Sequence, residues 1–445
     1  MAWLESVRTR AVRHPVEAQI IAIVSLILLS LLHYRIIFWW IPADPDQLNG
    51  LSMGTLADPQ RFFTHQILEL LPVYRPIYAL RFWLQYQIHG IDHVYLYQLV
   101  QLAFLLFAAT LMFLALRALT GRLDAPLVAA LAFTIDKRNQ PAMTWHDPLA
   151  MAVAFGTSAL WLLYRRTPGL LSCIAAVILL LMSGMSKEFG LAFTAFIGIE
   201  SAWRLVIRRD GAALKYFIIA AAVTVIYLSL RILLAHGAAS EHCAGSGYFW
   251  TSSDFCFKVG LIGEQFPQLL YNIGASFVGI FLPVLFKPSG ELTLLSDLSL
   301  PYVAYCALFI GLALYALVRG SREAWLAILL MVCSAVISFA LFRDRNHMVG
   351  EVGFYFAAGI GLALLLDRIA SYRVVLGVLT IMSVSMIGYA VRAERTLEDH
   401  LARILSTDYC AKNAEEKHID KTLARAIDAR YRPWMPPCPG QPAAK

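Results

Sequence analysis

Residues 18–38 read AQIIAIVSLILLSLLHYRIIF, and this predominantly apolar stretch decides the fold class. It is long enough to cross the roughly 30 Å hydrocarbon core of a bilayer as a single α-helix. Similar apolar runs recur along the chain, without the alternation that is typical of outer-membrane barrel strands. We therefore expect an all-α polytopic membrane protein.

The composition of the 445-residue chain agrees with that class. Hydrophobic residues make up 59% of the chain and charged residues 15%, and the mean hydropathy is +0.63. A net charge of +7 would suit a nucleic-acid partner, but the Lys and Arg residues stand in short clusters between the apolar runs. That distribution is typical of positive-inside topology, so we expect no nucleic-acid binding and a bilayer as the surroundings.

The basic clusters also predict how the chain crosses the bilayer. Arg8, Arg10 and Arg13 precede the first apolar run, which predicts a cytoplasmic amino terminus. That run is longer than a signal-peptide core and no small-residue cleavage site follows it, so we expect an anchor that stays in the mature protein. About eleven crossings are predicted in total, over residues 18–38, 94–116, 125–135, 147–164, 170–185, 191–207, 216–234, 302–318, 325–342, 352–366 and 374–391.

The apolar segment 266–286 is ambiguous, because it is long enough to span. A crossing there would place Arg319 and Arg368 outside, against the positive-inside bias. We therefore favour a re-entrant or broken segment, interrupted at Gly274, Gly279 and Pro283.

Two large outer loops, over residues about 39–93 and 235–264, indicate a roofed cavity on one face. The first is expected to contain interfacial helices over residues 62–71 and 77–88. Residues 1–392 would form the membrane domain, and residues 393–445 a short helical and Pro-rich tail outside the membrane.

The cysteines divide between the spans and the outer segments. Three lie in predicted spans, whereas the second outer loop and the tail each contain two, so we expect two disulfides in an oxidising compartment. The expected pairs are Cys243 with Cys256 and Cys410 with Cys438.

Ionisable residues gather on the predicted outer face. Residues 41–46, IPADPD, bring Asp44 and Asp46 to the end of the first span. Taken alone, each ionisable residue on this face has an ordinary structural explanation, such as pairing with lipid phosphate or capping a turn. Their coincidence at membrane depth nevertheless indicates a functional site. The others are Arg75, Asp136, His146, Asp147, Lys187, Glu188, Arg343, Arg345 and His347.

The order of three stretches carries a family resemblance. They are residues 74–91, YRPIYALRFWLQYQIHGI; residues 129–133 with 145–147, AALAF and WHD; and residues 180–188, LLMSGMSKE. This order resembles the GT-C superfamily of membrane glycosyltransferases that use polyprenyl-phosphate sugars, in its protein O-mannosyltransferase and TMTC-like branch with bacterial relatives. The likeness covers residues 15–210, with a weaker echo near 343–355. Asp44-Pro-Asp46 departs from the family's adjacent Asp pair, and Asp136-Lys137 from its His-Pro.

The resemblance implies a GT-C-like bundle and an inverting transfer from a polyprenyl-phosphate-linked sugar to a protein, lipid or glycan acceptor. Such a transfer needs a base for the acceptor hydroxyl and cations for the leaving phosphate. Asp46, or failing it Asp44, is the candidate base. The candidate phosphate ligands are Arg343, Arg345 and Lys187, with Arg75 and His347 in reserve; Glu188, Asp147, His146 and Asp136 would position substrates. The late spans and the re-entrant segment would hold the polyprenyl chain. We expect no cofactor, and do not favour the divalent metal that some oligosaccharide-transferring relatives use.

Three other functions compete with this interpretation. A transporter or flippase of lipid-linked sugars would place ionisable residues near the bilayer midplane. An O-antigen-type polymerase or ligase also has a large outer loop, and a scaffold would bind a partner through such loops. The expected location is a bacterial inner membrane with a periplasmic active site and a periplasmic carboxyl tail.

Overall fold

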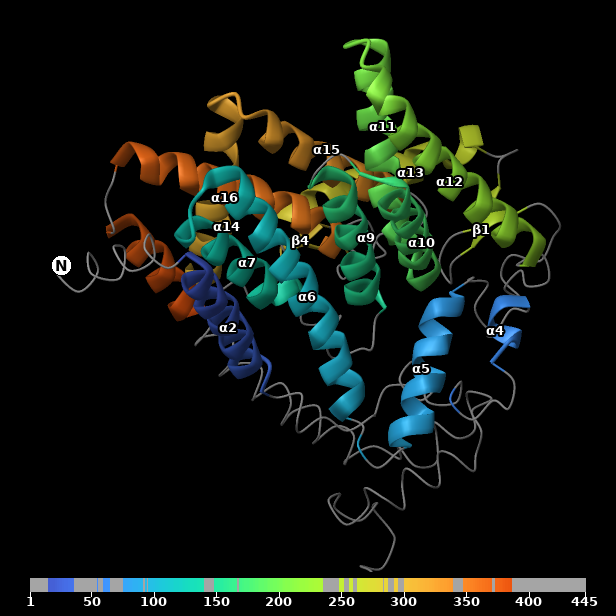
Figure 1. Ribbon diagram of the computed structural model, residues 1–445, viewed down its shortest axis with the longest axis horizontal. Coiled ribbons are helices and arrows are strands. Elements are labelled where there is room, and N and C mark those ends of the chain that lie inside the picture. The colour runs from blue at the N-terminus through green and yellow to red at the C-terminus, as the bar shows by residue number, and fades with distance from the viewer. Residues whose placement is uncertain are drawn as a thin grey trace, which may run out of the picture.

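The computed structural model describes residues 15–35, 54, 59–64, 75–90, 93, 95–139, 148–165, 168–234, 248–251, 256–258, 262–282, 284–286, 292–294, 300–338, 347–369 and 373–385. Over these residues the chain is mainly helical, as Figure 1 shows. The short strands pair as two antiparallel hairpins, β1 (Tyr248–Thr251) with β2 (Cys256–Lys258) and β3 (Val284–Phe286) with β4 (Leu292–Leu294). The helical class predicted from the apolar runs is therefore confirmed.

Six helical segments in this part of the chain are long and apolar enough to cross a membrane. Four of them are single helices: α2 (Pro15–His33), α6 (Tyr95–Thr120), α14 (Leu300–Val318) and α16 (Met348–Ile369). The other two begin with a short 3-10 turn: Glu188–Val206 contains α11 (Leu191–Val206), and Gly211–Arg231 contains most of α12 (Leu214–Leu234). Shorter apolar helices are α7 (Asp124–Ile135), α9 (Leu149–Tyr164), α10 (Leu170–Ser186) and Arg373–Ser385. These segments make the chain a membrane-embedded protein, while the count of about eleven crossings and the GT-C-like arrangement remain predictions.

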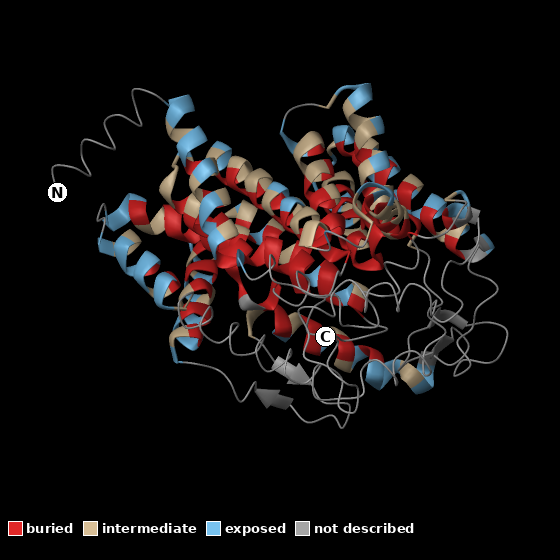
Figure 2. Ribbon diagram, turned by 90° about the horizontal axis from the view of Figure 1, so that it is seen from below, coloured by how far each residue is buried: buried red, intermediate tan, exposed pale blue. Residues whose placement is uncertain are grey.

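Helix α16 lies at the centre of the bundle and α2 at its edge. The share of buried residues is 83% in the most apolar window of α16 but 17% in that of α2, and Figure 2 shows the buried residues concentrated in the middle of the molecule. Small residues let neighbouring backbones approach α16 closely. A Cβ at Gly353 would lie 2.5 Å from the Ala327 carbonyl oxygen of α15 (Arg322–Ile337), and one at Gly361 would overlap the Leu312 carbonyl of α14.

Segment 262–281 is one continuous helix, α13 (Ile262–Phe281), so the predicted break at Gly274 and Gly279 is wrong. The chain leaves the helix just before Pro283. A glycine within a helix costs only about 1 kcal/mol, and packing against α15 and α16 offsets that cost. Helix α13 does not meet the hydropathy of a span.

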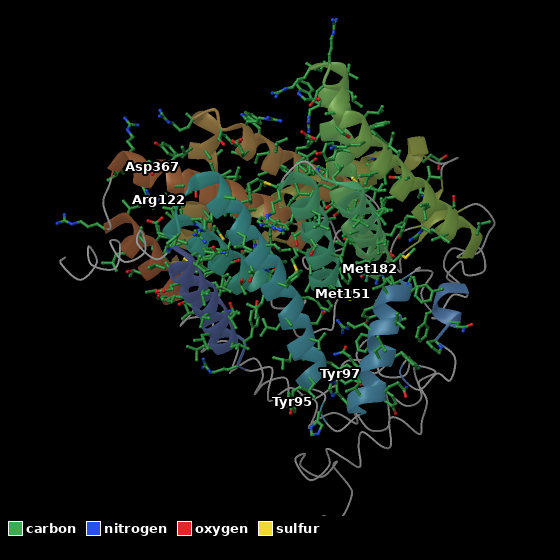
Figure 3. All side chains as sticks on the ribbon, in the orientation of Figure 1. Tyr95, Tyr97, Arg122, Met151, Met182 and Asp367 are labelled. Atoms are coloured by element: carbon green, nitrogen blue, oxygen red, sulfur yellow. The ribbon has the colours of Figure 1, made fainter. Side chains whose placement is uncertain are left out.

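The helices of the first outer loop agree in part with the prediction. Helix α5 (Pro76–His89) matches the expected interfacial helix, whereas α4 is described only over Arg61–Thr64. Tyr95 and Tyr97 lie near the end of α5 and far from Arg122 and Asp367, as Figure 3 shows.

The bundle has two chemically different ends. At one end, here called the basic end, Arg122 bonds to Asp367 at 2.7 Å and Arg322 lies 3.8 Å from Glu200. The opposite end, here called the polar end, carries Asp136, Lys187, Glu188, Arg231 and His347, at the other termini of the same set of helices.

Two of the helices that end at the polar end are shorter than the hydrocarbon core of a bilayer. Helix α7 has 12 residues and α10 has 17, which correspond to lengths of about 18 Å and 26 Å. A bilayer core is about 30 Å thick. We therefore expect the polar groups that follow these helices to lie within the thickness of the bilayer.

Candidate functional site

Glu188 is the centre of a charged cluster at the polar end. It follows α10 in a 3-10 turn, η3 (Glu188–Gly190), and its side chain is 2% exposed. Arg75, just before α5, donates to both carboxylate oxygens, with Nε 3.2 and 3.1 Å away and Nη2 2.8 Å away. Arg231 of α12 lies 3.6 Å from Oε1 on another side. We call Arg75, Lys187, Glu188 and Arg231 the Glu188 cluster.

The tight turn after α10 fixes this carboxylate in the bundle. Lys187 is extended, with φ −156° and ψ 138°, and Gly190 lies directly on Ser183, where a Cβ would be 2.5 Å from the Ser183 carbonyl oxygen. Ser183 in turn donates 2.7 Å to the Ala152 carbonyl of α9. Only a residue without a side chain fits at Gly190, so the turn is held against both helices.

The Glu188 cluster has more positive than negative charge. One carboxylate lies among two guanidiniums, and the adjacent Lys187 is buried with its ammonium 5.6 Å from the Phe189 ring centre. Arginine binds phosphate through two parallel N–H donors, and lysine binds it through one compact positive charge. Side chains of these types have the chemistry to bind an anion such as a phosphate.

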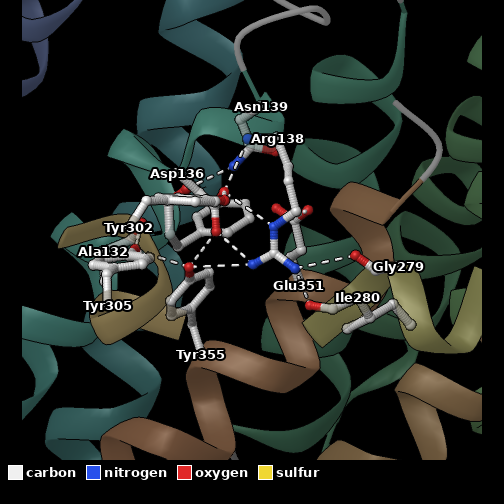
Figure 4. Close-up of polar contacts among 11 residues, drawn as sticks. Ala132, Asp136, Arg138, Asn139, Gly279, Ile280, Tyr302, Tyr305, Glu351 and Tyr355 are labelled. Atoms are coloured by element: carbon white, nitrogen blue, oxygen red, sulfur yellow. Dashed lines mark hydrogen bonds and ion pairs between the residues drawn. The ribbon is translucent and has the colours of Figure 1, made fainter. Parts of the chain in front are cut away.

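A second buried cluster surrounds Asp136 at the end of α7, as Figure 4 shows. Its carboxylate accepts hydrogen bonds from the backbone N–H of Arg138 at 2.9 Å, from the Arg138 guanidinium, and from the hydroxyls of Tyr302 (3.0 Å) and Tyr355. Burial alone would raise the pKa of Asp136, but the charge and hydrogen bonds of Arg138 and the Tyr355 hydroxyl lower it overall. Asp136 is thus an ionised and well-satisfied carboxylate.

Arg138 joins this cluster to α13 and α16. Its guanidinium donates to the carbonyls of Gly279 (3.2 Å) and Ile280, which belong to the last turn of α13 and lack helical partners. It also lies 3.4 Å from Oε1 of the fully buried Glu351 on α16. Two carboxylates therefore share one guanidinium inside the bundle.

His347 lies beside the second cluster, just before α16. A Cβ at Gly279 would overlap its imidazole, so the ring packs directly on α13. Burial first, and then the charge of Arg138, lowers the pKa of His347 to about 3, although Asp136 acts in the opposite direction. At neutral pH the imidazole is uncharged, so it can contact phosphate through a hydrogen bond but not as a cation.

The structure thus brings some of the predicted site residues together and separates others. Arg75, Lys187 and Glu188 share one cluster, whereas Asp136 and His347 belong to the second. The remaining predicted site residues lie outside the described residues: Asp44, Asp46, His146, Asp147, Arg343 and Arg345.

The predicted disulfides also fall on residues that the structure does not describe. Cys243, Cys410 and Cys438 lie in undescribed segments, and Cys256 is described only as backbone of β2. Cys173, Cys306 and Cys333 are free, in α10, α14 and α15, as expected for cysteines inside spans.

Sequence reasoning missed Arg231, Arg138 and Glu351. Arg231 is the one charge within the predicted span 216–234, and such a residue is by default a functional candidate. Glu351 stood at the edge of a predicted span. Nothing local signals the tyrosines, because Tyr302 and Tyr355 are remote from Asp136 in sequence.

Within the described ranges, no three His, Cys, Asp or Glu side chains gather in a way that could hold a metal ion. Since Asp44, Asp46 and Asp147 lie outside those ranges, metal independence remains a prediction. Comparison with protein-family models, curated proteins and solved structures gave no match to this chain.

Proposed function

We propose that the chain is a membrane glycosyltransferase that moves a sugar from a polyprenyl-phosphate-linked donor to an acceptor at the polar end of the bundle. The observation that carries the proposal is the Glu188 cluster, in which Arg75 and Arg231 contact one buried carboxylate and the adjacent Lys187 is also buried. A phosphate attached to a lipid tail is the anion that reaches this depth. The order of the sequence motifs points to the same chemistry.

The reaction would proceed as one displacement at the anomeric carbon. The acceptor hydroxyl gives its proton to Asp46 or Asp44 while its oxygen bonds to that carbon. The bond from the anomeric carbon to the donor phosphate oxygen breaks, and its electron pair leaves with the phosphate, so the configuration inverts. The added negative charge on the phosphate is stabilised by the cations, which we assign to Lys187, Arg75 and Arg231 together with Arg343 and Arg345.

The other predicted residues take supporting roles. Glu188 orients the two arginines through its bidentate contact with Arg75 and its ion pair with Arg231. Asp136 positions the connection after α7 through Arg138 and the tyrosines. Asp147 and His146 stay assigned to sugar hydroxyls, and His347 to a neutral hydrogen-bonding role.

A transporter or flippase of lipid-linked sugars is the second candidate, because the Asp136 cluster favours it. Asp136, Arg138 and Glu351 are ionisable and fully buried between α7 and α16. Ionisable groups at this depth are typical of transport pathways. Asp136 and Glu351 can carry two negative charges against the single positive charge of Arg138. These charges balance when one of the two carboxylates is protonated, as in proton-coupled carriers.

The test uses the full-length protein in nanodiscs with radiolabelled polyprenyl-phosphate sugars. Wild type is compared with Asp46→Asn, Asp44→Asn and the control Asp367→Asn, whose side chain is 60% exposed at the basic end. We expect one of the first two variants to lose at least 100-fold in sugar release, as expected for loss of a general base, and the control to retain wild-type turnover.

A second measurement separates the two candidates. The protein is reconstituted in liposomes, and the movement of the same lipid across the bilayer is followed without an acceptor. Movement that persists in both Asp variants, with no sugar released by well-folded wild type, would favour the flippase and exclude the transferase.

A further inference from the structure

A cavity of about 550 Å³ opens at the basic end, between α6, α9, α11, α15 and α16. Its walls are mostly apolar and include Met112, Leu160, Phe196, Leu330 and Phe356. Its volume falls within the roughly 300 to 1,000 Å³ that is typical of ligand pockets. Because Glu188 and Glu200 lie at opposite ends of the same candidate span, this cavity is separate from the Glu188 cluster.

The shape of the cavity suits a hydrocarbon chain. It follows α15 from Arg322 to Leu330, a rise of about 12 Å at 1.5 Å per residue. The deep walls at Met112, Leu330 and Val352 are buried, whereas Leu119 and Arg322 at the mouth are 53% exposed. An apolar slot offers water few hydrogen-bond partners, so an acyl chain is the natural occupant at membrane depth.

Both described carboxylates that line the cavity accept hydrogen bonds from the protein: Glu200, and Glu323, whose Oε2 accepts a 3.2 Å hydrogen bond from the Ser321 hydroxyl. Glu200 is 2% exposed, accepts a 3.1 Å hydrogen bond from the Tyr164 hydroxyl, and lies 3.7 Å from Arg204 and 3.8 Å from Arg322. Arg204 is also bound to Asp210 at 2.5 Å. Arg165 stacks over Trp161 with its guanidinium 5.1 Å from the ring centre, in an exposed position. Arg165 and the exposed part of Arg322 are thus the cations that face outward.

The surroundings of the mouth add to the positive field. Among the described residues, basic side chains outnumber acidic ones at this end of the bundle, and such an excess attracts anionic headgroups to the surface. Beyond the cavity lining, the described basic residues at this end are Arg117, Arg122, Arg208, Arg209, Lys215, Arg319, Arg368 and Arg373, and the acidic ones are Glu17, Asp124, Asp210 and Asp367.

We propose that this cavity binds one anionic phospholipid, with an acyl chain between α6 and α15 and the headgroup phosphate at Arg165 and Arg322. The apolar depth gives affinity for the chain and the two arginines give preference for the negative headgroup. A lipid in this position would join α9, α11 and α15, which otherwise meet at the mouth through the contacts of Glu200.

The experiment measures lipid binding to delipidated full-length protein by native mass spectrometry and by thermal unfolding. Phosphatidylglycerol and phosphatidylcholine with identical acyl chains are titrated separately. The proteins are wild type, the double variant Arg165→Gln with Arg322→Gln, and the control Arg319→Gln. Arg319 is exposed in the turn before α15 and does not line the cavity. A fourth variant, Ala115→Phe, fills the slot but leaves both arginines in place.

We expect wild type and Arg319→Gln to retain one phosphatidylglycerol and to bind it at least fivefold more tightly than phosphatidylcholine. The double variant should lose that preference, and Ala115→Phe should lose binding of both lipids. Equal binding of the two lipids by wild type, or the same loss in the control as in the double variant, would overturn the proposal. If the double variant does not fold, Ala115→Phe decides: unchanged lipid retention in that variant would also overturn it.

Discussion

Glu188 is a buried carboxylate whose ionised form depends on two arginines from distant parts of the chain. Arg75 contacts both of its oxygens, and Arg231 approaches one of them. A buried charge that loses its partner is strongly destabilising. The same guanidiniums are those proposed to hold the donor phosphate, so stability and activity are coupled at this residue.

A double-mutant cycle tests that coupling. Arg75→Gln leaves Glu188 with Arg231 at 3.6 Å, so we expect a loss of about 1–3 kcal/mol in unfolding free energy. Glu188→Gln should cost a similar amount, and the double variant less than the sum. Thermal unfolding in detergent supplies these values, and sugar release should stay low in all three proteins. Strictly additive losses would show that the pair does not interact.

The buried imidazole of His347 is expected to make the stability of the folded protein depend on pH. Its pKa is lowered in the folded protein to about 3, below the 6.5 or so of an exposed imidazole. The unfolded chain therefore binds the extra proton first, and stability is complete above pH 6.5 or so and falls as the pH decreases toward 3, by up to about 1.4 kcal/mol per pH unit.

Unfolding measured from pH 7.5 to 4 checks this expectation. His347→Gln should make the dependence in this window less steep, whereas His93→Gln, at an exposed position before α6, should leave it as in wild type. An identical slope in wild type and His347→Gln would exclude the imidazole as its source. The lowered pKa of Asp136 adds a further loss only at more acidic pH, below the 3.9 or so of an unperturbed Asp.

At the scale of elements, two glycines of α13 give a matched comparison. Helix α13 runs through both, but a Cβ at Gly279 would overlap the His347 ring, whereas one at Gly274 meets nothing within 4 Å. Gly279→Ala should lower stability by about 1–3 kcal/mol through overpacking. Gly274→Ala should raise it by about 0.5–1 kcal/mol, because alanine favours the helix. Thermal unfolding distinguishes the two, and equal effects would contradict the close packing of His347 on α13.

The same helix shows how far sequence reasoning reaches at this scale. Apolar runs predicted most helices to within a few residues, such as Leu170–Ser186 for α10, because span length and hydrophobicity are local properties. The break in α13 was predicted from the positive-inside bias of the following turns, with Gly274, Gly279 and Pro283 as its expected positions. Packing against α15 and α16 and the carbonyl contacts of Arg138 hold the helix intact, and these contacts are between segments remote in sequence.

The candidate site could be predicted only in part, for a similar reason. Lys187 and Glu188 were found because their short motif stands at the end of a predicted span, and Arg75 because its Arg-Pro motif lies in the first outer loop. The pairing of Arg75 with Glu188, and the part played by Arg231, needed the fold, since the three come from α5, η3 and α12. The hydrogen-bond partners of Asp136 could not be predicted either, because Tyr302 and Tyr355 lie on α14 and α16, far away in sequence.

At the scale of the whole molecule, the two chemically different ends predict opposite sides of a membrane. Helix α6 has 26 residues, about 39 Å, so its ends lie on either side of a core about 30 Å thick. The basic end carries most of the arginines in the turns, and the positive-inside rule assigns it to the cytoplasm. We then expect the Glu188 cluster on the outer side of the membrane, as the proposed transfer requires.

Cysteine labelling tests this orientation in intact bacterial cells. His93→Cys lies before α6 at the polar end, and Arg319→Cys lies in the exposed turn between α14 and α15. We expect a membrane-impermeant maleimide to label His93→Cys directly and Arg319→Cys only after permeabilisation, with unmodified protein giving the background from native cysteines. The reverse pattern would invert the orientation and place the proposed transfer in the cytoplasm. Labelling of both variants in intact cells would mean that the two ends share one side, which the length of α6 forbids for a spanning helix.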